Sequence, residues 1–217
     1  MMLRSLAFVA ALALFSGCSL IGIKSGYEQP AYTVVERIGE RVEIRRYASR
    51  LAAETTVAAS DAGQARNESF EILFDYISGK NQGGSKVAMT APVEVGAGAE
   101  KIAMTVPVET GAANYGRYAM RFFLPGSYTK ATAPEPTDPR VQIVEVPEAT
   151  LAVLLFSGWR NPERVETRKA ELMKTLVGSK WRVTGTPTAL FYDPPWTLPF
   201  LRRNEVAVAV MSAQKKD

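Results

Sequence analysis

The chain has 217 residues, of which 47% are hydrophobic and 22% charged, with one cysteine, no histidine and a formal net charge of +4. This length is enough for one domain of roughly 150–200 residues and a short leader. A single cysteine excludes an intrachain disulfide. The absence of histidine excludes zinc sites built on Cys and His, and also Ser-His-Asp and Cys-His catalysis.

The basic residues are scattered along the chain, and the densest groups are only pairs, such as Arg45-Arg46, Arg202-Arg203 and Lys215-Lys216. Proteins that bind nucleic acid usually cluster their basic residues on one face. We therefore interpret these charges as solvated surface and expect no nucleic-acid partner.

Residues 1–18 are typical of a bacterial lipoprotein signal peptide. Arg4 supplies a positive charge, residues 6–15 form an apolar stretch, and Ser16-Gly17 precede Cys18. The apolar stretch is shorter than the ~20 residues that a spanning helix needs, and its length fits a signal peptide. The segment resembles the lipobox, in which the cysteine is acylated, although Phe15 stands where that pattern prefers an aliphatic residue. A cleaved secretory signal with an incidental cysteine, or a buried N-terminal helix, remains an alternative.

We therefore expect lipidation of Cys18 and anchoring of the chain to a membrane of the cell envelope. Ser19 follows the cysteine, whereas Gram-negative lipoproteins retained at the inner membrane carry aspartate there, so the resemblance indicates the outer membrane and its periplasmic side. Residues 19–30 contain Gly, Ser and Pro without periodicity and are interpreted as a tether. The domain itself is expected over residues 31–213.

The first half of the domain predicts three strands and a helix. Runs rich in β-formers at 32–36 and 42–47 flank a hairpin turn, and residues 51–59 predict a third strand. Asp61 is a plausible helix N-cap. After it, Phe70, Leu73, Phe74 and Ile77 follow the spacing of an amphipathic helix, which Gly79 ends.

A local repeat follows this helix. Residues 86–94 (KVAMTAPVE) recur as residues 101–109 (KIAMTVPVE), with Gly96 and Gly98 between the two copies. Both copies alternate, so we expect two strands of a hairpin. Pro92 and Pro107 cannot donate ladder hydrogen bonds and indicate an edge or a bulge.

The second half repeats the order of strands, helix and strands. Residues 118–124 predict a strand, a Pro-rich loop covers 129–140, and strands are expected at 141–146 and 150–156. Asn161 and Pro162 predict the start of a second helix, which ends at Gly178. Strands at 186–192 and 206–210 close the domain. Two similar halves of this kind favour an antiparallel, barrel-like α+β domain.

Several segments resemble the SOUL haem-binding family over Tyr32 to Val210. The resemblance rests on VEIRRY at 42–47, on the doubled Ala-Met-Thr-x-Pro-Val motif, and on residues 122–125, 156–158 and 192–206. It implies a distorted eight-stranded antiparallel β-barrel flanked by two helices and made of two pseudo-repeated halves.

The resemblance also implies haem or another tetrapyrrole as a non-covalent ligand, which some family members bind without an axial histidine. Carried over by position, the ligand lies against the first helix, and a second wall comes from the loop at 194–197. The implied site residues are Arg66, Phe70, Leu73, Phe74, Ile77, Trp196 and Thr197. Ligation by histidine is excluded in this chain, and we predict no protein-bound metal site.

The same residues also have simpler interpretations. The helix stripe is what any helix packed on a sheet shows, and Met89 and Met104 are better explained as core residues than as thioether ligands. Trp196 either stacks on a flat ring or covers the barrel. Arg202 and Arg203 either pair with propionates or, as we favour, bond backbone carbonyls of the C-terminal loop.

No set of residues indicates catalysis, so the sequence does not predict an enzyme. The favoured function is a membrane-anchored tetrapyrrole-binding protein for haem capture, buffering or transfer. One alternative is a module for another flat amphipathic molecule, since the fold is similar to effector-binding domains of multidrug regulators, a likeness that is analogy only. The other is an envelope structural protein without a small ligand.

Overall fold

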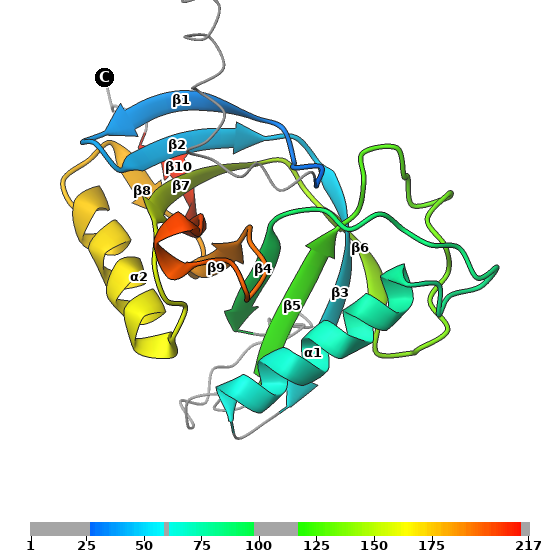
Figure 1. Cartoon of the computed structure of the whole chain (residues 1–217). Coiled ribbons are helices and arrows are strands. Elements are labelled where there is room, and N and C mark those ends of the chain that lie inside the picture. The colour runs from blue at the N-terminus through cyan, green and yellow to red at the C-terminus, as the bar shows by residue number, and fades with distance from the viewer. Residues whose placement is uncertain (1–26, 59–60, 98–116, 214–217) are drawn as a thin grey trace, which may run out of the picture.

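The computed structural model describes residues 27–58, 61–97 and 117–213, which form two α-helices and a curled sheet (Figure 1). In chain order the elements are β1 (Tyr32–Ile38), β2 (Val42–Tyr47), β3 (Arg50–Ala58), α1 (Ala62–Ile77), β4 (Val93–Ala97), β5 (Arg117–Phe123), β6 (Gln142–Val146), β7 (Ala149–Phe156), α2 (Pro162–Leu176), β8 (Trp181–Val183), β9 (Thr188–Phe191), the short 3-10 helix η2 (Pro199–Leu201) and β10 (Asn204–Ser212).

The strands pair in the order β1-β2-β7-β10-β9-β4-β5-β3-β6, and β8 adds to the end of β10. All of these strand pairs are antiparallel. The order is symmetric about the β9–β4 pair, because β7-β10-β9 on one side matches β3-β5-β4 on the other. The strand that precedes each set of three in the chain pairs with the other set, so that β2 pairs with β7 and β6 pairs with β3. This arrangement agrees with two similar halves.

The predicted α+β class is confirmed, but the eight-stranded barrel is not. The described strands form a curled half-barrel with nine strands on one path and β8 beside it, and β1 and β6 are the ends of that path. The sequence did not reveal β8, because a strand of three residues that pairs only with the end of β10 has no detectable alternation.

The first copy of the repeat is strand only at its end. Residues 86–92 lie outside any strand, and β4 continues through Gly96, which was predicted to be in the turn. The reason is that this segment bonds elsewhere: the Val87 N–H donates to the Ile77 carbonyl and the Ala91 N–H to the Glu28 carbonyl, both at 2.9 Å. The second copy, with Met104 and Pro107, lies outside the described residues.

Each helix covers one half of the sheet. The helix α1 packs on β3 and β5, whereas α2 packs on β7, β8 and β10. Leu73 and Tyr76 join the core under α1, and Leu172 and Leu176 join the core under α2. The predicted cap is confirmed, since the Asp61 carboxylate accepts the Gln64 N–H at 2.8 Å. Each helix thus closes a core on its own half of the sheet, and a smaller third cluster that includes Val153 and Leu190 lies apart from both.

The signal peptide, Cys18 and most of the tether lie outside the described residues. Among the helices that the structure describes, none has the length and apolar character required to cross a membrane.

Candidate functional site

The helix face predicted to bind a ligand is divided between core and surface. Leu73 and Ile77 are 0% and 5% exposed and belong to the core under α1. Phe70 and Phe74 are 38% and 46% exposed, and their rings stack with centroids 5.8 Å apart. Phe70 also meets the buried Phe122 ring edge-on at 5.4 Å. The surface that this face offers to a ligand is therefore the Phe70–Phe74 pair.

The second predicted wall is the loop between β9 and β10, which contains Trp196 and Thr197. The Trp196 side chain is 82% exposed. The buried Arg202 holds this loop, because its guanidinium donates to the carbonyls of Thr197 and Pro195. The favoured interpretation of Arg202 as a residue that holds this loop is confirmed. Thr197 contributes its backbone carbonyl oxygen, which accepts the bond from Arg202.

Arg203 does not have the role that we favoured for it. Its guanidinium pairs with the Glu205 carboxylate at 2.7 Å and donates to the Gln29 side chain at 3.2 Å, and its ring contact is with Tyr192 at 3.9 Å. The prediction of bonds to loop carbonyls is therefore wrong for this residue, because a buried carboxylate stands two positions along the strand.

Arg160, which sequence reasoning missed, is bonded to the start of the loop between β9 and β10. This half-buried residue lies between β7 and α2 and donates to the Asp193 carbonyl at 3.1 Å. Burial, and then the positive charges of Arg202 and Arg66, lower the pKa of Arg160. The charges of Arg202 and of Arg66 on α1 thus both act on the half-buried Arg160 guanidinium.

Exposed aromatic and aliphatic side chains lie beside Arg202 and along the loop between β9 and β10. Trp159 is 63% exposed and its ring lies 5.5 Å from the Arg202 guanidinium carbon, while Leu198 and Phe200 are 54% and 70% exposed. Large apolar side chains exposed together often mark a binding surface. The sequence signal for Trp159 and Arg160 was an aromatic-basic pair just before the Asn161-Pro162 helix start.

This surface suits a flat apolar molecule that carries acidic groups. The Phe70–Phe74 pair provides an aromatic face, and guanidiniums pair well with carboxylates. Met89 is partly buried against the core under α1, as favoured. Groups of three or more metal-ligating side chains do not occur within the described residues.

A separate ionic network is buried between β2 and β10. Glu205, which is 0% exposed, accepts two bonds from Arg45 at 3.0 and 2.9 Å and one from the Tyr192 hydroxyl at 2.8 Å. Burial raises the pKa of Tyr192 well above its ordinary value, so its hydroxyl stays a donor. Because every member is paired within the network, we assign it to the stability of the sheet.

Residues 27–209 match the family model described as SOUL heme-binding protein. None of the curated proteins is a match. Among solved structures, the C-terminal domain of EcmrR is similar over 79% of this chain and 98% of that chain, with 10% identity and a TM-score of 0.58. A hydrolase from Listeria innocua is similar over 79% of this chain and 92% of that chain, with 13% identity and a TM-score of 0.51. At such identities these likenesses show the fold alone.

Proposed function

The chain belongs to the SOUL haem-binding family, and from this premise we propose that it binds haem or a related tetrapyrrole on the surface between α1 and the β9–β10 loop. The support for the proposal is the exposed Phe70–Phe74 pair, with Arg66 one turn earlier on the same helix and its charge among those that act on Arg160. A tetrapyrrole with propionates has the matching features, an apolar disc and carboxylates at one edge.

The residues present fit such a ligand without an imidazole. Phe70 and Phe74 would contact the ring, and Arg66 and Arg160 would pair with the propionates, since Arg202 is already bonded to loop carbonyls. Bound haem would supply an iron centre with its own chemistry. The protein would hold the ring through apolar contact, at about 25 cal/mol per Å² before association costs. We therefore propose binding and transfer, not catalysis.

Replacing Phe74 by alanine is expected to weaken haemin binding about tenfold, a loss of ~1.4 kcal/mol. The ring is 46% exposed, so its removal takes away ligand contact while leaving the core closed. The shift of the Soret band during titration of the purified full chain measures the dissociation constant. Val177→Ala is the matched control, because Val177 is 81% exposed and follows α2.

Two further results test whether the protein ligates the iron and whether the ring lies against Phe74. Haemin and protoporphyrin should bind with similar affinity, because no imidazole is available to the iron. A Phe74→Ala variant that titrates like the unaltered chain would show that the ring lies elsewhere.

We also propose that the domain is held at a membrane of the cell envelope through a lipid on Cys18. The support is the position of the only cysteine at the end of the apolar leader, together with a matched family region that begins at residue 27. The intervening residues would allow the domain to stand off the lipid surface. Two or more acyl chains hold a protein stably, where one is marginal.

Replacing Cys18 by serine is expected to move the protein from the membrane fraction to the soluble fraction and to abolish incorporation of labelled palmitate. The Cys18 sulfur is the atom that would carry the lipid, and the chain has no second cysteine to replace it. Fractionation after expression in a Gram-negative bacterium tests this, with Ser19→Ala as the control that should stay at the membrane. Persistent membrane association of Cys18→Ser would argue for an uncleaved N-terminal helix.

A further inference from the structure

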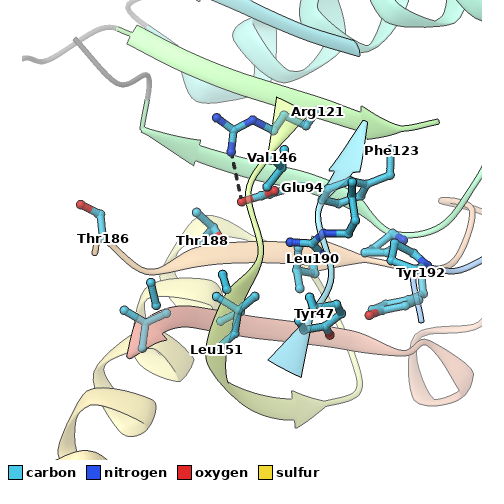
Figure 2. Close-up of a pocket in the computed structure, with 17 residues that line it drawn as sticks. Tyr47, Glu94, Arg121, Phe123, Val146, Leu151, Thr186, Thr188, Leu190 and Tyr192 are labelled. Atoms are coloured by element: carbon cyan, nitrogen blue, oxygen red, sulfur yellow. Dashed lines mark ion pairs between the residues drawn. The ribbon is translucent and has the colours of Figure 1, made fainter. Parts of the chain in front are cut away.

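A cavity of about 240 Å³ lies within the curl of the sheet, away from the surface assigned to the tetrapyrrole. Its walls come from both halves of the domain, with Tyr47 from β2, Phe123 from β5, Leu151 from β7 and Leu190 from β9 (Figure 2). Most of the lining is apolar, so the charged residues that reach the cavity determine what it can hold.

Two of these charged residues, Arg121 and Glu94, belong to one group of ion pairs. Arg121 lies 3.7 Å from the Glu94 carboxylate, the pair marked by the dashed line in Figure 2, and also bonds to Glu54 of the neighbouring strand. The cavity lining contains one further cation, Arg50, the first residue of β3.

Arg50 has no carboxylate within 4.0 Å of its guanidinium among the residues that the structure describes. Its buried Nε has no hydrogen-bond partner. The guanidinium carbon lies 4.5 Å from the Tyr47 ring centroid and 4.7 Å from that of Phe123. Burial lowers the pKa of Arg50, and the charge of Glu94 opposes this only in part.

A desolvated guanidinium without a carboxylate partner is costly, and an anionic ligand would remove that cost. The two aromatic contacts hold the fork of Arg50 in place while leaving N–H groups unused. Such a fork matches a carboxylate, which can accept two parallel bonds. The arrangement therefore resembles a receptor for an anion.

The volume limits the size of that anion. Drug-sized ligands occupy pockets of ≈300–1,000 Å³, so about 240 Å³ is too small for a tetrapyrrole. A cavity of this size suits a small aromatic or short aliphatic acid. We propose that this cavity binds a small apolar carboxylate, with Arg50 as the group that receives the carboxylate and the apolar walls as the contact for its hydrocarbon part.

Benzoate is a suitable probe, and benzyl alcohol is its uncharged counterpart. Calorimetry on the purified full chain, without haemin, should show benzoate binding at least tenfold tighter than benzyl alcohol. Arg50→Met should weaken benzoate binding at least tenfold and leave benzyl alcohol unchanged, and Arg50→Lys should be intermediate. Arg140→Met is the control, because Arg140 is exposed and pairs with Asp138 outside this cavity.

Thermal unfolding separates this role from a structural one. A desolvated charge without a carboxylate partner carries a free-energy cost that an apolar side chain does not, so Arg50→Met should melt at the same temperature or higher. If Arg50→Met does not fold, Arg50→Lys carries the binding test. The proposal is overturned if millimolar benzoate gives no heat, if Arg50→Met or Arg50→Lys binds it as well as the unaltered chain, or if haemin displaces it.

Discussion

Replacing Glu205 by glutamine is expected to lower the free energy of unfolding by about 3–5 kcal/mol. The carboxylate is fully buried and pairs with Arg45, which is 3% exposed, and with Arg203. Glutamine keeps the shape of the side chain, but it removes the negative charge and turns one acceptor into a donor that faces guanidiniums. Among the described residues, Arg203 would then have no carboxylate partner, and the buried Arg45 would keep only Glu43.

Urea unfolding followed by circular dichroism measures this loss. Glu68→Gln is the matched control, because Glu68 is 51% exposed and its pair with Arg140 is also exposed, so its loss should cost less than ~1 kcal/mol. Equal effects of the two substitutions would mean that the Glu205 network does not stabilise the sheet. An intermediate effect with a smaller m-value would indicate a change in the unfolded ensemble.

Sequence reasoning succeeded where local signals agreed with the final fold. The cap at Asp61, the stop at Gly79 and the Asn161-Pro162 helix start all depend on neighbouring residues, and each lies where it was expected. The prediction of a strand at 86–92 was wrong because the backbone of this segment bonds to Glu28 and to the end of α1, which no local pattern reveals. A pairing decided by distant segments cannot be read from alternation alone.

The candidate site shows the same division. The stripe on α1 could not separate the core residue Leu73 from the exposed Phe74, since both fit the same helical spacing. Arg160 and Arg50 were missed because their importance depends on which charges surround them after folding. Arg202 and Arg203 are adjacent, yet one bonds loop carbonyls and the other a buried carboxylate.

Replacing Leu73 by alanine is expected to destabilise the domain by about 2–5 kcal/mol, the range for truncating a buried leucine. The side chain is 0% exposed and lies in the core between α1 and the sheet, so its loss leaves a cavity that the rigid sheet cannot close. Phe74→Ala, one position along the same helix, removes a side chain that is 46% exposed and should cost less than half as much.

Haemin affinity should rank these two variants in the opposite order. Leu73→Ala leaves the exposed Phe70–Phe74 pair in place, so the protein that remains folded should titrate haemin like the unaltered chain. Phe74→Ala removes half of that pair and should bind about tenfold more weakly. If α1 uses one side for the core and the other for the ligand, urea unfolding should show the larger loss of stability for Leu73→Ala. Soret titration should show the larger loss of affinity for Phe74→Ala. Loss of affinity in Leu73→Ala beyond its unfolded fraction would instead mean that the ligand enters the core.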